Sequence, residues 1–178
     1  MIKKIVNFFL YFFFNIKIIR ILSHKNKIII LENLSKNLFY KISFSRSANN
    51  LLLNENEGYK WYSKVLKKKF NFKLSDNFFK RFEIEKFHGN LVDYHKSVII
   101  NKKNIYRVIN YYKKNLPKKK IVSAHGDFTF ANLVFGNDKN SIYIIDWENF
   151  KKSGEPWGFD LVYFFISIAI LPNLKKNK

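Results

Sequence analysis

Residues 125–132 of the chain read HGDFTFAN, and residues 144–148 read IIDWE. The first stretch places Asp127 and Asn132 five positions apart, and Asp146 in the second stretch follows a short apolar run that is typical of a strand. Lys, Asn, Ile, Phe, Leu and Tyr dominate the sequence, whereas residues 126–160 contain four of the six glycines and four of the six aspartates. Such residues mark special backbone geometry and placed charge, so the region is the first candidate for a functional site.

Outward from these stretches, the sequence predicts a mixture of strands and helices. Short β-branched and aromatic runs bounded by polar residues predict strands. Apolar positions that recur every three or four residues predict helices. The expected strands are residues 27–32, 38–43, 81–87, 120–123, 133–135 and 142–145, and the expected helices are residues 50–69, 91–116 and 158–171.

This order of elements predicts the α+β class, without an internal repeat or a Gly/Ser-rich linker. A chain of 178 residues is long enough for one sizeable core or for two small lobes that share a cleft. We expect an apolar and basic N-terminal segment at residues 1–20, a strand-rich lobe at residues 21–88 and a helical lobe at residues 89–178. The likeliest hinge lies near His88.

The polar side chains of the two stretches suit phosphoryl transfer, which needs a carboxylate near the acceptor hydroxyl, oxygen ligands for Mg²⁺ and a cation on the nucleotide phosphates. A hairpin between the predicted strands would return Asp146 to the loop that carries Asp127 and Asn132. Amide and carboxylate oxygens are the hard donors that Mg²⁺ prefers. Each residue alone fits a capped turn or a strand end, but together, in this order and spacing, they favour an active site. Trp147 and Trp157 are expected to pack in the interior rather than to bind substrate.

The two stretches resemble the aminoglycoside phosphotransferase and choline kinase family, relatives of the protein kinases, through the pattern His125-Gly126-Asp127-x-x-x-x-Asn132 followed by Ile145-Asp146-Trp147-Glu148. The resemblance implies a protein-kinase-like two-lobed fold with a small N-terminal β lobe. It also implies that Asp127 is the catalytic base, that Asn132 and Asp146 bind Mg²⁺, and that His125 braces the loop.

The resemblance extends more weakly to other parts of the chain. Lys41, centred on a predicted strand, resembles the lysine that binds the nucleotide phosphates. Glu57 resembles its helix partner, with Glu55 as the alternative, although a lysine on a strand and a glutamate on a helix are ordinarily solvated. Glu85 begins the segment EKFHG, which resembles the lobe-connecting strand whose backbone hydrogen-bonds adenine. Asp160 matches a structural aspartate of the family, which supports the site rather than reacting.

Two features depart from the family pattern. The turn expected at residues 23–26 contains no glycine, so the flexible loop that covers the phosphates in protein kinases is absent or replaced. The sequence also ends at Lys178, soon after the predicted helix at residues 158–171, where the family continues with further helices that shape the acceptor pocket. We therefore expect a truncated helical C-terminal lobe and an acceptor site that is shortened or built differently.

The resemblance implies a Mg²⁺-dependent kinase that transfers the γ-phosphate of ATP, or of another nucleoside triphosphate, to a hydroxyl group of a small molecule. The cationic acceptors of the family need acidic or aromatic walls, whereas this chain has a net charge of +20 and ends in a basic tail. A neutral or anionic acceptor, such as a sugar or an envelope precursor, is therefore our hypothesis. The alternatives are a truncated, inactive nucleotide-binding relative and a basic adaptor at a membrane surface or on nucleic acid.

The positive charge by itself does not favour nucleic acid as a partner. A basic surface attracts phosphate non-specifically, but the 33 Lys and Arg residues are scattered along the chain and no nucleic-acid-binding motif accompanies them. We expect nucleotide and small-molecule partners instead. The absence of cysteine excludes disulfides and thiolate metal sites and fits a cytoplasmic protein.

The N-terminal segment, residues 3–20, contains an apolar run with basic residues at both ends. The run of about a dozen residues is shorter than the ~20 that a membrane-spanning helix needs, and no small-residue cleavage site follows it. As a helix, the segment would have a narrow polar stripe. Two interpretations are equally favoured: a helix in the membrane interface on the cytoplasmic side, or a helix packed onto the protein itself.

Overall fold

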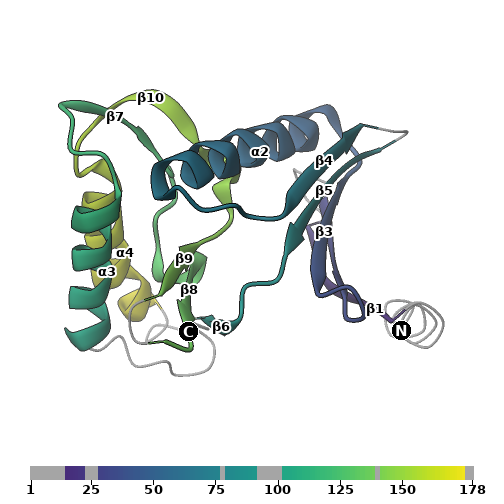
Figure 1. The fold of residues 1–178 in the computed structure, drawn as a ribbon, viewed down its shortest axis with the longest axis horizontal. Coiled ribbons are helices and arrows are strands. Elements are labelled where there is room, and N and C mark those ends of the chain that lie inside the picture. Colours follow the sequence, from purple (N-terminus) through teal and green to yellow (C-terminus); the bar gives the residue numbers. More distant parts are fainter. Residues whose placement is uncertain (1–14, 23–27, 77–78, 92–101, 139–140, 175–178) are drawn as a thin grey trace.

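The computed structural model describes residues 15–22, 28–76, 79–91, 102–138 and 141–174. These residues form an α+β fold, as the sequence predicts (Figure 1). The helices are α2 (Arg46–Leu66), α3 (Lys102–Asn115) and α4 (Phe159–Leu174), with two short 3₁₀ helices, η1 (Phe130–Asn132) and η2 (Trp147–Asn149). The strands are β1 (Ile16–Leu22), β2 (Ile28–Asn33), β3 (Leu38–Ser43), β4 (Phe72–Asp76), β5 (Lys80–Glu85), β6 (Gly89–Leu91), β7 (Ile121–Ala124), β8 (Leu133–Gly136), β9 (Ile142–Ile144) and β10 (Lys151–Pro156).

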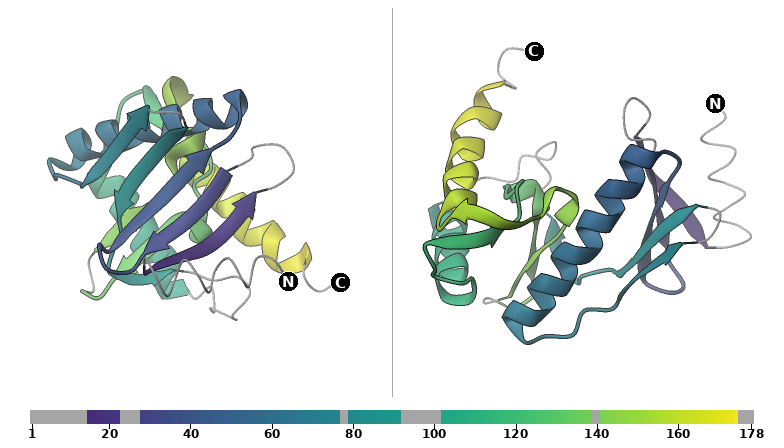
Figure 2. Two further views of the ribbon diagram at one scale, coloured as in Figure 1. Left: turned by 90° about the vertical axis from the view of Figure 1, so that its right-hand side faces the viewer. Right: turned by 90° about the horizontal axis from the view of Figure 1, so that it is seen from above.

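The main sheet contains five antiparallel strands in the order β1-β2-β3-β5-β4. The predicted hairpin is confirmed, since β2 and β3 pair along their whole length. β3 is the central strand of the sheet, and Lys41 lies opposite Ile30 on β2 and Phe82 on β5. Helix α2 covers one face of this sheet (Figure 2). The pairing on both sides of β3 therefore fixes the backbone of Lys41 beneath the helix.

Helix α2 has well-defined ends. It begins after Ser45, whose side-chain oxygen accepts a hydrogen bond from the backbone N–H of Ala48 at 3.2 Å. It ends at Lys67, which adopts a left-handed backbone with φ of 51°. The buried positions recur every three or four residues: Ala48, Leu52, Glu55, Asn56, Gly58, Tyr59 and Tyr62. The buried stripe thus includes the carboxylate of Glu55, which needs a partner from the sheet.

The remaining elements form a second group on the far side of α2. β8 and β9 form the predicted hairpin and pair with β6 in a three-stranded sheet, while β7 pairs with β10. α3 and α4 lie on the side of these small sheets that faces away from the main sheet (Figures 1 and 2). One hydrophobic core runs through both groups, from Ile28 and Phe82 in the main sheet to Phe128 and Phe164 near α4.

The N-terminal segment differs from the helix that the sequence predicts. Residues 16–20 belong to β1, because their backbone pairs with β2 and their branched side chains suit a strand. Residues 1–14, and with them most of the expected interfacial helix, lie outside the described residues, as does the expected turn at 23–26. Within the described ranges, no helix is long and apolar enough to cross a bilayer.

Other elements also differ from the prediction. Of the expected helix at residues 91–116, the described part is α3, while Leu91 belongs to a strand that pairs with β8 and residues 92–101 lie outside the described residues. Strands β4 and β10 were not predicted. The sequence of β10, KKSGEP, contains no apolar alternation, and it forms a strand only because β7 lies beside it.

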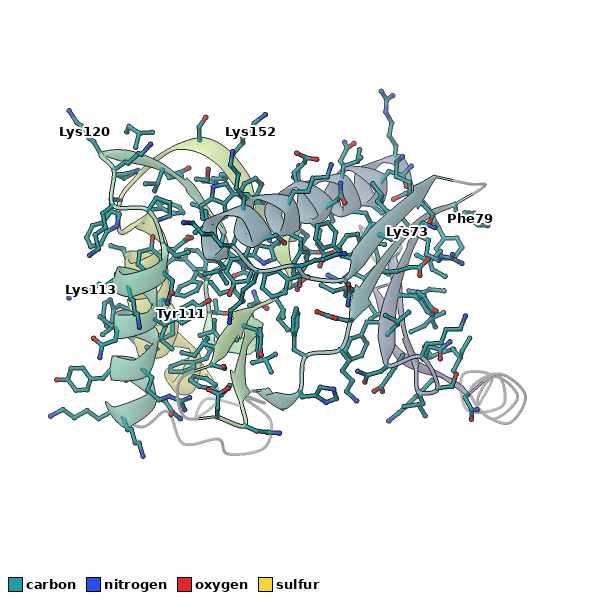
Figure 3. The ribbon with its side chains drawn as sticks, viewed as in Figure 1. Lys73, Phe79, Tyr111, Lys113, Lys120 and Lys152 are labelled. Atoms are coloured by element: carbon teal, nitrogen blue, oxygen red, sulfur yellow. The ribbon has the colours of Figure 1, made fainter. Side chains whose placement is uncertain are left out.

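The positive charge is distributed over the outside of the protein (Figure 3). The labelled lysines lie on different parts of the chain: Lys73 on β4, Lys113 on α3, Lys120 before β7 and Lys152 on β10. Many aromatic side chains, in contrast, are buried in the hydrophobic core, among them Tyr59, Tyr62, Phe82 and Trp147.

The contact between α2 and η2 leads to a stability prediction. A Cβ atom on Gly58 would lie 2.5 Å from the Cβ of Trp147, which is fully buried. We expect Gly58→Ala to lower the free energy of unfolding by roughly 1–3 kcal/mol through overpacking, although alanine is favoured over glycine in a helix by about 1 kcal/mol. Urea denaturation measures this change. The matched control is Asn50→Ala, at an exposed position of the same helix, which should stay within about 0.5 kcal/mol of wild type. Equal stability of the two variants would contradict the packing argument.

Candidate active site

The site is organised around the ammonium group of Lys41. Its Nζ lies 2.9 Å from the Oε2 of Glu55 on α2 and forms a second ion pair with the carboxylate of Asp146 after β9. Burial alone would lower the pKa of Lys41, but the negative charges of Asp146 and Glu55 outweigh burial and hold that pKa well above its ordinary value. Lys41 therefore stays charged and connects the sheet, α2 and the β9 loop.

The helix partner of Lys41 is Glu55, and the predicted pairing with Glu57 is wrong. Glu57 lies on the exposed side of α2, where its carboxylate pairs with Lys60 at 2.8 Å. Two positions along a helix correspond to a rotation of about 200°, so the two glutamates point in nearly opposite directions. Glu55 follows Leu52 by three positions and precedes Tyr59 by four, which places it in the buried stripe. Burial raises the pKa of Glu55 to about 7, while the charge of Lys41 opposes that shift.

Asp146 lies in the turn between β9 and η2, where hydrogen bonds fix the backbone on both sides of it. Its backbone adopts a left-handed conformation with φ of 65°, which aspartate tolerates better than most residues. The hydroxyl of Tyr59 forms a hydrogen bond with the backbone of Asp146. The next residue, Trp147, is fully buried, and its indole N–H donates to the carbonyl of Ile144 at 3.0 Å. Contacts on both sides thus determine where the carboxylate of Asp146 points.

The loop after β7 brings Asp127 and Asn132 together. The side-chain nitrogen of Asn132 donates to the backbone carbonyl of Asp127 at 2.8 Å and to its carboxylate Oδ2 at 3.0 Å. The hydroxyl of Tyr163 on α4 also hydrogen-bonds this carboxylate. Burial raises the pKa of Asp127, and the hydrogen bond from Asn132 partly opposes the shift. Burial outweighs the hydrogen bond, and the raised pKa makes the carboxylate a stronger proton acceptor than an exposed aspartate.

His125 and Asp160 support the loop after β7 through hydrogen bonds. The carboxylate of Asp160, at the start of α4, accepts hydrogen bonds from the backbone N–H groups of His125 at 2.9 Å and Gly126 at 3.1 Å. The imidazole of His125 is buried, and its Nε2 lies 2.9 Å from the carbonyl oxygen of Ile145. The backbone N–H of Asp127 donates to its Nδ1 at 3.2 Å. This pattern requires the neutral ring with the proton on Nε2, so His125 links the loop at residues 125–132 to the strand end at Ile145.

A cleft of about 390 Å³ lies between the main sheet and the second group of elements. Lys41, Glu55, Asn132 and Asp146 line its polar end. Its apolar walls are formed by Ile30, Phe39, Tyr59, Ile84, Phe87, Ala131, Val134 and Ile145. Asp127 adjoins this cleft through its hydrogen bonds to Asn132. Residues distant in the sequence therefore converge on one cavity, as the hairpin argument predicts.

Glu85 also lines this cleft, at the end of β5. Its carboxylate accepts a hydrogen bond from the side-chain nitrogen of Asn71 at 2.8 Å, and its backbone N–H donates to the carbonyl of Asn71 at 3.0 Å. The following residues Lys86, Phe87 and Gly89 line the same cavity. The segment that we expected to connect the two lobes thus forms one wall of the cleft.

Sequence reasoning missed two tyrosines at this site. Tyr59 lies one helical turn after Glu55 and touches the backbone of Asp146, and Tyr163 lies three positions after Asp160 and reaches Asp127. The i, i+4 spacing from Glu55 could have indicated Tyr59, which shares the buried stripe of the predicted helix. The surrounding strands and loops decide what each hydroxyl meets.

The donor set suits a cation that needs few protein ligands. Within the described ranges, no group of three or more His, Asp or Glu side chains could hold a metal ion. Asp146 and Asn132, which both line the cleft, instead offer one carboxylate and one amide oxygen, and a backbone hydrogen bond of 2.9 Å from Ile145 to the carbonyl of Asn132 holds the two segments together. Both hydrogen bonds of the Asn132 amide to Asp127 use its nitrogen, which leaves the carbonyl oxygen as the atom that can coordinate a cation. This pair fits Mg²⁺, which usually keeps several waters and combines one or two carboxylates with substrate oxygens.

Comparison with known proteins adds no family to these observations. No protein-family model matches the sequence, and a search of curated proteins gives no significant match.

The choice of Glu55 over Glu57 can be tested by a pair of matched substitutions. Glu55→Ala removes the buried one of the two carboxylate partners of Lys41, so we expect the free energy of unfolding to fall by roughly 2 kcal/mol or more. Glu57→Ala removes an exposed ion pair and should cost less than about 1 kcal/mol. Denaturant unfolding of the two variants at neutral pH checks this difference. Equal losses would show that Glu55 is not the supporting partner.

The buried imidazole predicts a pH dependence of stability. Burial lowers the pKa of His125 to about 4, whereas an unfolded histidine titrates near ~6.5. Between these values the unfolded chain binds a proton that the folded chain excludes. The contribution of His125 is therefore complete above pH ~6.5 and is lost as the pH falls toward 4.

The measurement is the free energy of unfolding between pH 7 and 4.5 for wild type and His125→Gln. We expect wild type to lose on the order of 2–3 kcal/mol more than the variant over this range. Glu55 has a raised pKa and acts in the opposite direction, since protonation of Glu55 favours the folded state, but it is present in both proteins and cancels in the comparison. Parallel pH curves would mean that His125 is not buried as a neutral ring.

Proposed function

We propose that the chain is a Mg²⁺-dependent phosphotransferase with a protein-kinase-like, two-lobed fold. The observation that carries this proposal is the convergence of Lys41, Asn132 and Asp146 on one cleft, with Asp127 bonded to Asn132. These residues come from β3, the loop after β7 and the turn after β9. They supply the phosphate-binding cation, the hard oxygen ligands and the carboxylate that phosphoryl transfer needs.

The cleft has separate polar and apolar parts that suit a nucleoside triphosphate. Lys41, held by Glu55, would pair with the phosphates of ATP at the polar end. The base would lie between the apolar walls, against the backbone of residues 85–89. A cavity of about 390 Å³ is in the range of small-molecule sites.

Mg²⁺ would be held by the carboxylate of Asp146 and the amide oxygen of Asn132. When bound, the ion would neutralise charge on the phosphate oxygens during transfer. Tyr59 and Trp147 would keep Asp146 in place by fixing its backbone. The side chain of Asp146 is 37% exposed, which leaves room for it to face both Lys41 and a ligand.

Asp127 would orient the acceptor hydroxyl and take its proton. Asn132 and Tyr163 hold its carboxylate, and burial raises its pKa, which favours proton acceptance. His125 and Asp160 would keep the loop rigid without touching the reacting groups. The acceptor that this arrangement would serve is a hydroxyl group of a small molecule, for which a sugar or an envelope precursor suits the basic chain.

The experiment is ATP turnover with Mg²⁺ and a panel of sugars, polyols and nucleosides as acceptors. Asp127→Asn should lower kcat by about 10²–10⁴-fold while ATP binding remains. Asp146→Asn should abolish the Mg²⁺-dependent part of ATP binding. Glu83→Gln, which removes one carboxylate outside the cleft, is the matched control and should behave as wild type.

Three other outcomes would contradict parts of the proposal. Equal turnover by wild type and Asp127→Asn would overturn the assignment of the base. ATP binding that depends on Asp146, without transfer to any acceptor, would point to an inactive nucleotide-binding protein. Absence of Mg²⁺-dependent ATP binding would overturn the whole proposal.

A further inference from the structure

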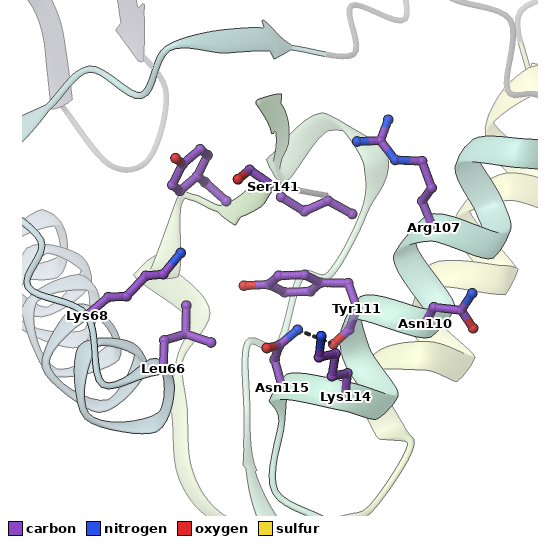
Figure 4. Close-up of a pocket in the computed structure, with 10 residues that line it drawn as sticks. Leu66, Lys68, Arg107, Asn110, Tyr111, Lys114, Asn115 and Ser141 are labelled. Atoms are coloured by element: carbon purple, nitrogen blue, oxygen red, sulfur yellow. Dashed lines mark hydrogen bonds between the residues drawn. The ribbon is translucent and has the colours of Figure 1, made fainter. Parts of the chain in front are cut away.

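A second pocket, of about 440 Å³, has a lining distinct from that of the cleft (Figure 4). It is enclosed by the end of α2, one face of α3 and the start of β9. Figure 4 shows Leu66 and Lys68 from the end of α2 facing Tyr111 and Asn115 from α3 across the pocket. Among the described residues, its lining consists of Leu66, Lys68, Arg107, Asn110, Tyr111, Lys114, Asn115, Ser141, Ile142 and Tyr143.

The charge of this lining has one sign. Lys68, Arg107 and Lys114 contribute three cations, and none of the described lining residues is Asp or Glu. Asn110 and Asn115 add amide groups between the cations. Three positive side chains around one small cavity repel each other unless an anion lies between them.

Arg107 gives an independent indication of a missing partner. Its Nη2 is buried and has no hydrogen-bond partner among the described residues. The guanidinium stacks on the ring of Phe135, with 4.9 Å from Cζ to the ring centre, so it is held in place by an apolar neighbour. A buried donor of a charged group without a partner is costly. A ligand with acceptor oxygens would satisfy it.

The carboxylate of Asp138 is bonded to a residue of the lining, Ser141. Asp138, at the end of the β8–β9 hairpin, accepts hydrogen bonds from both the backbone N–H and the hydroxyl of Ser141. The side-chain nitrogen of Asn115 donates a hydrogen bond to the backbone carbonyl of Tyr111 at 2.9 Å (Figure 4). The three cations therefore give the described lining of the pocket a net positive charge.

We propose that this pocket binds a small molecule that carries phosphate groups, separately from the nucleotide cleft. Guanidinium and ammonium groups together recognise phosphate oxygens, and the guanidinium can donate two parallel hydrogen bonds. Tyr111 and Tyr143 supply aromatic walls for the part of the ligand next to the phosphates. The volume is sufficient for a molecule of mononucleotide size.

The pocket shares a wall with the cleft. The ring of Tyr143 stacks on Phe87, with centroids 4.7 Å apart, and Phe87 lines the cleft while Tyr143 lines this pocket. Tyr111 also reaches α2, where its hydroxyl is 2.5 Å from that of Tyr62. A ligand in this pocket would therefore contact Tyr143, whose ring stacks on a residue that lines the cleft.

The test is calorimetric titration of the protein with inorganic pyrophosphate in the absence of Mg²⁺. The pocket variants are Arg107→Gln and Lys68→Gln; Lys68 is exposed, so its substitution does not endanger folding. Lys113→Gln is the matched control, since it removes the same charge from α3 outside the pocket. Figure 3 shows Lys113 at the outer edge of α3 and Tyr111 on the side that faces the rest of the protein. Lys41→Met removes the cation of the cleft.

We expect Arg107→Gln and Lys68→Gln each to weaken pyrophosphate binding by about tenfold, the factor that corresponds to ~1.4 kcal/mol. Lys113→Gln should leave the affinity within about twofold of wild type, because an exposed charge outside the pocket contributes little. The same binding component should persist in Lys41→Met. The melting temperature of each variant without ligand shows that it is folded.

Three results would overturn the proposal. The first is no pyrophosphate binding by the wild-type protein. The second is binding that only Lys41→Met removes, which would place pyrophosphate in the cleft. The third is equal weakening by Lys113→Gln and Lys68→Gln with a steep salt dependence, which would indicate diffuse attraction to the positive surface. None of these results bears on transfer by Asp127, so the two proposals fail independently.

Discussion

The packing of Trp147 against Gly58 is the contact on which the geometry of the cleft depends. Trp147 is fully buried and touches the aromatic rings of Tyr59, Tyr62 and His125. Because Gly58 has no side chain, the indole reaches the backbone of α2 directly. Trp147 follows Asp146 in the chain, and Gly58 lies within one turn of Glu55. This single contact therefore sets the separation of the two carboxylates that share Lys41.

The polar groups of the site are stable in the interior because they satisfy one another. Lys41 is buried with two carboxylates, whose charges outweigh the cost of removing the ammonium group from water. His125 is buried as a neutral ring with partners at both nitrogens. Asp160 is bonded to two backbone N–H groups of the same loop. Such a network holds only if every member is in place, which favours one arrangement of the loops.

The sequence pattern identified the polar residues that line the cleft better than it identified the residues that hold them in place. Asp127, Asn132 and Asp146 could be identified because few residue types suit their positions and the spacing between them is set by a short hairpin. Glu55 and Glu57 could not be ranked from their distance to Lys41, although the stripe of Leu52, Tyr59 and Tyr62 contained the answer. Tyr163 has no signal of its own as a partner of Asp127, because only the packing of α4 against the loop brings the two together.

The sequence by itself determined the α+β class, the β2–β3 and β8–β9 hairpins and the residue types at the polar end of the cleft, because local periodicity and short-range spacing carry that information. The tertiary structure decided which side chains meet. β10 is a strand only beside β7, Glu55 rather than Glu57 faces the sheet, and Arg107 meets Lys68 and Lys114 around a second pocket. The physical reason is that burial and pairing are long-range: a side chain acquires its partner and its charge state from segments that the sequence places far away.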